Sequence, residues 1–281
     1  MLMERLKLGQ KNKLKAAWKV DFGMYLEGGG YDGKILLPER YVPGDLEVGD
    51  EIEVFLYLDN EERLVATTIE PKAMVGDFAY LEVAWVNEYG AFLDWGLMKD
   101  LFCPFREQKR RMQQGQSYIV HVHIDEDSYR IMASAKVEKF LAPLPHDYTA
   151  GREVELLIWQ KTDLGFKVII DNGYAGLLYD TQIFCNLHTG DRVKGYISNI
   201  RPDGKVDCAL QKTGRVHTEN FSARLLRYLE TQGGRCRLGD KSDAEEIKQQ
   251  FGVSKRTYKQ AIGDLYKRHL IEITDSGIVL L

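Results

Sequence analysis

The feature that most constrains the fold is a repeat of about 70 residues that runs through the first three quarters of the chain. Three sets of glycines and one set of tryptophans recur at spacings of 66 or 67 and then 74 or 75 residues. These landmarks are Gly9, Gly76 and Gly151; Gly23, Gly90 and Gly165; Gly49, Gly115 and Gly190; and Trp18, Trp85 and Trp159. Because a fixed period indicates a copied structural unit, the sequence predicts three related domains and a different fourth segment.

The repeats have the pattern of small β-barrels. Apolar and polar residues alternate at 52–56 and 193–197, and turn signals such as Asn172-Gly173 separate the alternating runs. Several short strands in each repeat predict a closed five-stranded barrel of the OB-fold type. We therefore expect a mainly β protein with a C-terminal α+β module. Its predicted segments are repeat one (1–72), repeat two (73–147), repeat three (148–213) and a fourth segment (214–281).

Composition excludes several classes of protein. The 281 residues include 38 Lys and Arg against 42 Asp and Glu, and the net charge of -4 argues against a protein that coats nucleic acid by bulk charge. No apolar run approaches the ~18 residues of a spanning helix, and the charged N-terminus is unlike a secretory signal. The four cysteines lack a paired spacing. We expect a cytoplasmic protein with reduced thiols and no membrane partner, cofactor or metal.

Repeat two carries an ordered set of motifs: Gly76-Asp77, Tyr89-Gly90-Ala91-Phe92, Asp100-Leu101-Phe102-Cys103-Pro104, Gly115-Gln116 and Arg130-Ile131-Met132-Ala133-Ser134. This order resembles the S1 domain, the RNA-binding OB-fold repeat first seen in the largest small-subunit ribosomal protein. Three such repeats before a winged helix resemble, over nearly the whole chain, the conserved virulence factor B family of bacterial RNA-associated proteins. The resemblance implies RNA binding and a part in post-transcriptional regulation of gene expression.

The resemblance also implies which residues contact RNA, namely two aromatic residues, a His on the next strand and a late Arg in each repeat. An aromatic ring contributes ~1 to 3 kcal/mol per stacked base. The corresponding residues are Phe22, Tyr25, Leu36 and Arg63 in repeat one; Tyr89, Phe92, Cys103 and Arg130 in repeat two; and Leu164, Lys167, Tyr179 and Lys205 in repeat three. No repeat keeps the complete set, and we rank repeat two first and repeat three last.

The tryptophans can widen this surface. Trp18 and Phe22, and likewise Trp85 and Tyr89, are four residues apart and share a strand face if no bulge intervenes. The alternative for these aromatic residues is that they belong to the barrel cores or pack between domains.

A basic loop in repeat two is a second candidate contact. Residues 106–111 contain four basic side chains and one acidic side chain. Lys109, Arg110 and Arg111 could hold phosphates, although a run of charge is also typical of a solvated face.

The fourth segment changes to a helical period. Apolar spacing predicts helices around Phe221–Leu229, Ala244–Phe251 and from Ser254 onward, followed by a hairpin at 271–280, which together make a winged helix. Ser242 and Glu245 have the spacing of a capping box. Lys255, Arg256 and Lys259 open the third helix, where a winged helix can present side chains to duplex nucleic acid. Winged helices also dock proteins.

Catalysis has no signature in the chain. His121 and His123 share a strand face, but no third ligand follows, and we expect a surface pair. Asp125-Glu126-Asp127 has the pattern of a solvated turn. The leading hypothesis is a non-enzymatic protein that binds single-stranded RNA. The alternatives are a DNA-binding transcription regulator that acts through the winged helix and a protein-interaction scaffold.

Overall fold

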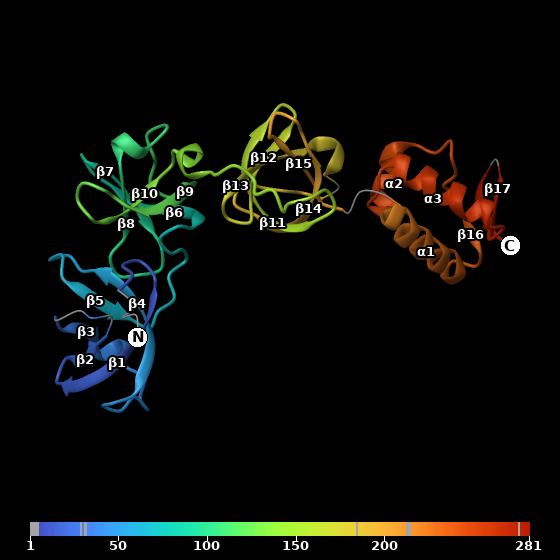
Figure 1. The fold of residues 1–281 in the computed structure, drawn as a ribbon. Coiled ribbons are helices and arrows are strands. Elements are labelled where there is room, and N and C mark those ends of the chain that lie inside the picture. Colours follow the sequence, from blue (N-terminus) through green and yellow to red (C-terminus); the bar gives the residue numbers. More distant parts are fainter. Residues whose placement is uncertain (1–5, 29, 31–32, 184, 212–214, 275) are drawn as a thin grey trace. The chain divides into compact units, whose positions relative to one another are not determined.

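The computed structural model describes residues 6–28, 30, 33–183, 185–211, 215–274 and 276–281, and the side chains of 181 and 215–220 are not described. The chain forms two compact units, Met1–Leu141 and Ala142–Leu281. The first unit contains two closed barrels, and the second contains a third closed barrel and a helical C-terminal domain (Figure 1). Each barrel has five strands, which confirms the predicted fold class. The exact domain boundaries remain a prediction.

The three barrels have the same topology. Barrel one contains β1 (Lys11–Val20), β2 (Gly23–Glu27), β3 (Ile35–Pro38), β4 (Glu51–Leu58) and β5 (Leu64–Thr67). Barrel two contains β6 (Phe78–Val86), β7 (Gly90–Asp94), β8 (Leu101–Pro104), β9 (Ser117–Ile124) and β10 (Ile131–Ser134). Barrel three contains β11 (Glu153–Thr162), β12 (Gly165–Ile170), β13 (Tyr174–Tyr179), β14 (Arg192–Ile200) and β15 (Val206–Ala209). In each barrel the third and fifth strands pair in parallel and the other pairs are antiparallel.

Four short 3-10 helices lie after the third strand of each barrel and after β10: η1 (Glu39–Tyr41), η2 (Phe105–Glu107), η3 (Val137–Phe140) and η4 (Asp180–Gln182). Among the described residues, no helix is both long and apolar enough to cross a membrane.

One glycine set explains why the repeat is visible in the sequence. Gly23, Gly90 and Gly165 each begin the second strand of a barrel. A β-carbon at any of these positions would lie 2.1 to 2.4 Å from a carbonyl oxygen of the third strand. Only glycine allows this close approach of two backbones, so the landmark marks the same position in all three barrels.

The C-terminal domain is the predicted winged helix. Its elements are α1 (Arg215–Thr231), β16 (Arg235–Cys236), α2 (Ala244–Phe251), α3 (Lys255–Lys267), β17 (Ile271–Thr274) and β18 (Gly277–Leu280). The strands form a sheet in the order β16-β18-β17. Phe221, Leu225 and Tyr258 are among the buried residues of one core that joins the helices to the sheet.

The capping box predicted before α2 is wrong. Asp243 is the N-cap residue, and its carboxylate accepts a hydrogen bond from the Glu245 backbone N–H at 2.7 Å. The Ser242 hydroxyl instead accepts from the Gly239 backbone N–H at 2.8 Å. Both Asp and Ser favour N-cap positions, so spacing alone did not separate the two adjacent candidates.

Candidate nucleic-acid interface

Barrel two carries a row of three aromatic rings across neighbouring strands. Trp85 on β6 pairs in register with Phe92 on β7, which pairs with Phe102 on β8. The rings of Trp85 and Phe92 are stacked at 3.7 Å and 4°, and Phe92 and Phe102 are 4.9 Å apart. Trp85 is 43% exposed, and its indole N–H donates to Asp100 at 2.8 Å, which fixes the ring. This ring row lies on the outside of the barrel.

Barrel one carries a shorter version of the ring row. Trp18 on β1 pairs with Tyr25 on β2, and their ring centroids are 5.1 Å apart. The third position, which pairs with Tyr25, is Leu36. The Lys34 ammonium lies 4.9 Å from the centre of the Trp18 ring, so a cation borders this row.

The prediction that Trp18 shares a strand face with Phe22, and Trp85 with Tyr89, is wrong. Phe22 and Tyr89 lie in the turns after β1 and β6 rather than on the strands. They are 57% and 66% exposed, which excludes them from the barrel cores. The tryptophans instead meet the aromatic residue on the neighbouring strand.

Barrel three lacks the ring row because its tryptophan is displaced by one residue. The first two tryptophans follow a bulge in their strand, whereas Trp159 lies at the bulge itself, and Gln160 pairs with Lys167. Trp159 is 8% exposed, and the Lys167 ammonium lies 5.2 Å from the centre of its ring. The spacing from Trp85 to Trp159 is 74 residues, one less than the 75 of the glycines, so Gln160 rather than the tryptophan takes the paired position after the bulge.

The three residues assigned to the His of the S1 pattern are not equivalent. In each barrel one residue of the third strand pairs with the glycine that opens the second strand, and it serves as a reference position. Leu36 lies two residues before this position, Cys103 lies one residue before it, and Tyr179 occupies it. Cys103 is fully buried, and burial raises the pKa of its thiol to about 12. Phe102 is the outward-facing residue at this place in barrel two, because Leu101 and Cys103 on either side of it are buried.

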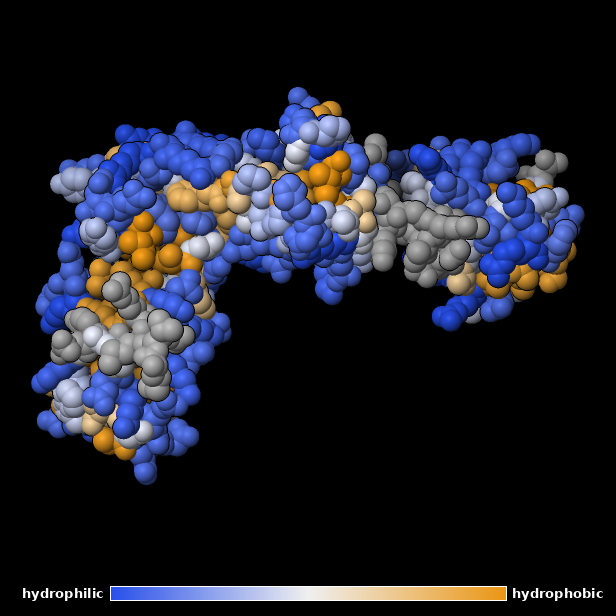
Figure 2. All heavy atoms as spheres, viewed as in Figure 1, coloured by the Kyte–Doolittle hydropathy of each residue, from blue (hydrophilic) through white to orange (hydrophobic). Residues whose placement is uncertain are grey.

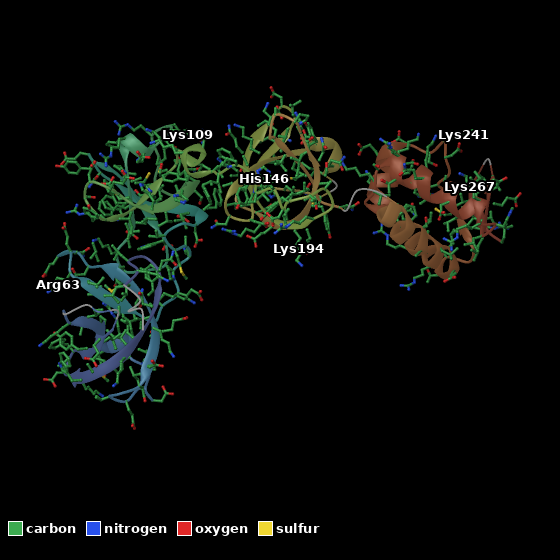
Figure 3. All side chains as sticks on the ribbon, in the orientation of Figure 1. Arg63, Lys109, His146, Lys194, Lys241 and Lys267 are labelled. Carbon is green, nitrogen blue, oxygen red and sulfur yellow. The ribbon has the colours of Figure 1, made fainter. Side chains whose placement is uncertain are left out.

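The predicted late arginines are exposed but paired with acidic side chains of one hairpin. Arg63, labelled in Figure 3, follows the β4–β5 turn and contacts Asp59 at 2.7 Å and Glu61 at 2.9 Å. Arg130 forms an ion pair with Glu62. RNA phosphates would have to exchange with these carboxylates to reach either guanidinium group.

The predicted late cation of barrel three, Lys205, directly precedes β15, which is the position that the late arginines of the first two barrels hold before β5 and β10. Arg201 donates to Asp207 at 2.7 Å and also to the Tyr179 hydroxyl. Lys205, the predicted residue, forms an exposed ion pair with Asp203 at 2.9 Å.

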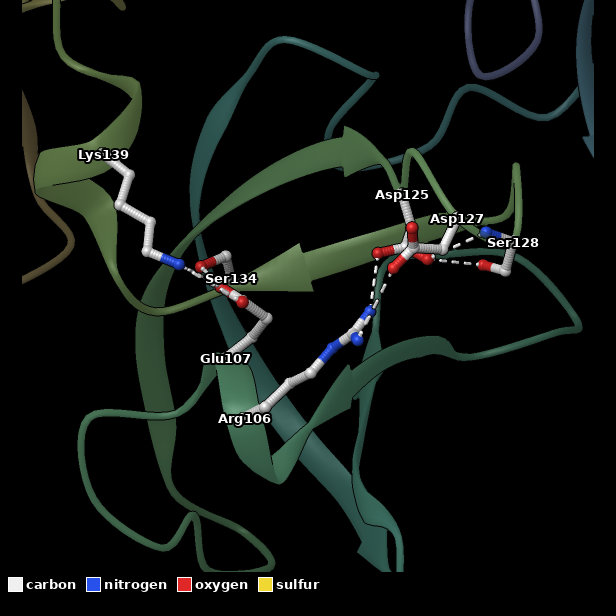
Figure 4. A network of polar contacts seen from close by, with 7 residues as sticks. All are labelled: Arg106, Glu107, Asp125, Asp127, Ser128, Ser134 and Lys139. Atoms are coloured by element: carbon white, nitrogen blue, oxygen red, sulfur yellow. Dashed lines mark hydrogen bonds and ion pairs between the residues drawn. The ribbon is translucent and has the colours of Figure 1, made fainter.

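The basic loop of barrel two is partly neutralised by a polar network. Arg106 donates to Asp125 at 2.7 Å, and Glu107 accepts from Ser134 and Lys139 (Figure 4). Asp125 also accepts from Ser128, so the prediction of a solvated acidic turn is wrong for Asp125.

The three candidate phosphate contacts lie beside this network. Lys109 contacts Glu138 at 2.6 Å, and the Arg111 guanidinium lies 3.3 Å from the centre of the Phe105 ring. Arg110 is exposed at the edge of the same loop, 5.8 Å from the centre of the Tyr118 ring. Arg110 and Arg111 therefore remain the better candidates for phosphate contacts.

His121 and His123 are not the expected surface pair. His121 is 9% exposed and stacks on Phe140 of η3 at 4.0 Å, while His123 is half-buried and lies 5.0 Å from the same ring. Burial, and secondarily the neighbouring His123, lower the pKa of His121 to about 4. The pair helps to hold η3 against the barrel. Within the described part of the chain, no group of three or more His, Cys, Asp or Glu side chains could hold a metal ion.

The winged helix places its candidate residues on the first turns of α3. Ser254 caps this helix by accepting from the Thr257 backbone N–H at 3.1 Å. Arg256 and Lys259 are exposed, and Lys255 is half-buried.

The comparisons with known proteins agree with this architecture. A family model described as a CvfB-like winged helix domain matches residues 223–280, and an S1 domain matches residues 8–69. The YitL protein of Bacillus subtilis, described as uncharacterized, is 27% identical over 94% of this chain and 90% of its own. Conserved virulence factor B of Staphylococcus aureus is 24% identical over 89% of this chain and 86% of its own.

A solved structure is also similar. It is a multidomain protein with nucleic acid binding domains from Streptococcus pneumoniae, with 23% identity, 98% of each chain covered and a TM-score of 0.43. The sequence matches confirm the expected resemblance to conserved virulence factor B. The S1 match supports a role in nucleic-acid binding, and neither matched family model describes an enzyme.

Proposed function

We propose that this chain, which resembles conserved virulence factor B over most of its length, is a cytoplasmic bacterial protein that binds single-stranded RNA on its first two barrels. The observation that carries the proposal is the ring row of barrel two, where the exposed Trp85 stacks on Phe92 at 3.7 Å and Phe102 continues the row. Every base has a flat face, so such a row accepts unpaired bases with little sequence preference.

Charge supports stacking as the main source of affinity. The chain has a net charge of -4, and the late arginines of barrels one and two are paired with carboxylates. We expect a binding reaction with a modest salt dependence, because few phosphates would be neutralised. By analogy with the family, the protein takes part in post-transcriptional control of gene expression by binding this RNA.

The test is a fluorescence titration of the full chain with single-stranded RNA and, separately, with duplex DNA. Quenching of tryptophan fluorescence by single-stranded RNA at low salt, with weaker binding of the duplex, is the expected result. The absence of RNA binding at low salt would refute the proposal.

A second candidate is duplex binding by the winged helix, favoured by the exposed Arg256 and Lys259 at the start of α3. It predicts tight duplex binding that falls when both residues are replaced by alanine. A protein-interaction scaffold would bind neither nucleic acid.

A further inference from the structure

The two barrels of the first unit have grooves that run into each other. A groove of about 680 Å³ follows the ring row of barrel two, and a groove of about 590 Å³ follows Tyr25 and Phe22 of barrel one. Four residues line both grooves: Tyr57 and Asn60 of barrel one, and Met98 and Lys99 of barrel two. The two candidate surfaces are therefore continuous at these four residues, which we call the junction.

The junction is held by contacts between the two barrels. Phe55 on β4 packs edge-on against Trp95 at 5.7 Å, and both belong to one buried core that continues through barrel two. The Trp95 indole N–H donates to the Lys99 carbonyl at 2.6 Å, and the Lys99 ammonium donates to the Asp59 carbonyl at 2.7 Å. Figure 2 shows hydrophobic residues gathered where the two barrels meet. Because a shared apolar core resists separation, the junction is a fixed part of the surface.

The side chains of the junction suit a nucleotide. Met98 is 64% exposed although it is apolar, and a thioether makes favourable contacts with flat aromatic rings. Asn60 is exposed beside it and can both donate and accept hydrogen bonds at a base edge. The Lys99 ammonium, half-buried by the same contacts, adds a positive charge where a phosphodiester would pass.

We propose that the junction is a base-binding subsite that joins the two ring rows, so that one single strand of RNA crosses from barrel one to barrel two without a break. The inference rests on the proposed function and adds the path of the strand. Met98 is the platform between Tyr25 of barrel one and Phe92 of barrel two.

The experiment compares two oligouridylates of about 4 and about 12 nucleotides, since one OB-fold covers roughly 4 to 16 nucleotides. The full chain should bind one 12-mer but two 4-mers, as measured by calorimetry. The 12-mer should bind at least about tenfold more tightly, because its second contact is made at a high effective concentration.

The matched variants are Met98→Asp and Val48→Asp. Val48 is 59% exposed and does not line either groove, so the control makes the same change of charge elsewhere on the first unit. Met98→Asp should lower the ratio of 12-mer to 4-mer affinity about tenfold, and Val48→Asp should leave it within about twofold.

Two results would overturn the inference while leaving the proposed function intact. One is that the chain binds two 12-mers with the affinity of the 4-mers, and the other is that both variants keep the parental affinity ratio. If the chain binds neither oligonucleotide, the proposed function itself is wrong, and this inference falls with it.

Discussion

Replacing Trp85 by alanine removes the most exposed ring of the row on barrel two. The change deletes the 3.7 Å stack on Phe92 and the hydrogen bond to Asp100. An aromatic pair contributes about 0.5–1.5 kcal/mol and a hydrogen bond about 0.5–1.5 kcal/mol, so the free energy of unfolding should fall by about 1–3 kcal/mol. This loss is small enough for barrel two to remain folded.

The effect on RNA should be larger than the effect on the fold. One stacked base is worth about 1–3 kcal/mol, which corresponds to a dissociation constant about 5- to 150-fold higher. The assay is fluorescence anisotropy of a labelled single-stranded RNA at several salt concentrations. Because no phosphate contact is removed, the slope of log K against log salt should not change.

Tyr80→Ala is the matched control. Tyr80 lies on the same strand, β6, and is also 43% exposed, but it does not line either groove. Its replacement should leave the dissociation constant within about twofold, since a stacked base is worth at least about 1 kcal/mol and none is lost. Equal affinities for the two variants, or a changed salt slope for Trp85→Ala, would show that Trp85 does not stack a base.

Three further changes test other parts of the surface. Glu62→Gln should strengthen RNA binding up to about fivefold, because it releases Arg130 from a surface ion pair of about 0.2–1 kcal/mol. Glu126→Gln makes an equal change of charge in an exposed turn and should not strengthen binding. Equal RNA titrations of the two variants would contradict this prediction. Replacing the three basic side chains of residues 109–111 by alanine should make the salt slope shallower by up to about 2, and an unchanged slope would reject that loop as a phosphate contact. Because the pKa of His121 is lowered to about 4, the neutral imidazole contributes fully to stability above about pH 6.5. This contribution, at most about 3 kcal/mol, is lost as the pH falls toward 4. In denaturant unfolding, His121→Leu should lose less stability over this pH range than the parent chain.

The sequence was sufficient for the fold because its landmarks report backbone geometry. Gly23, Gly90 and Gly165 recur since no β-carbon fits there, and this requirement is the same in every barrel. The helical period and the capping residue Ser254 located the winged helix, because both signals depend only on residues close together in the sequence. Asp243 is the exception, since it competes with an adjacent Ser for one cap position.

The candidate site was harder to predict from the sequence because it depends on which strands pair. The bulge at Trp159, and the pairing that adds Phe102 to the ring row, are not visible in a single strand. Met98 was missed because it matters only where two barrels meet. The pairing of Arg130 with Glu62 joins residues 68 positions apart, and no local motif reports such a contact.

Binding of single-stranded RNA on the first two barrels can be tested directly by mapping where the RNA contacts the full chain. Ultraviolet crosslinking to an oligonucleotide that contains 4-thiouridine, followed by mass spectrometry, identifies the contacted residues. Stacking of bases on the two ring rows predicts crosslinks at Trp85, Phe92 and Phe102 and at Trp18 and Tyr25. Crosslinks confined to barrel three or to α3 of the winged helix would contradict it.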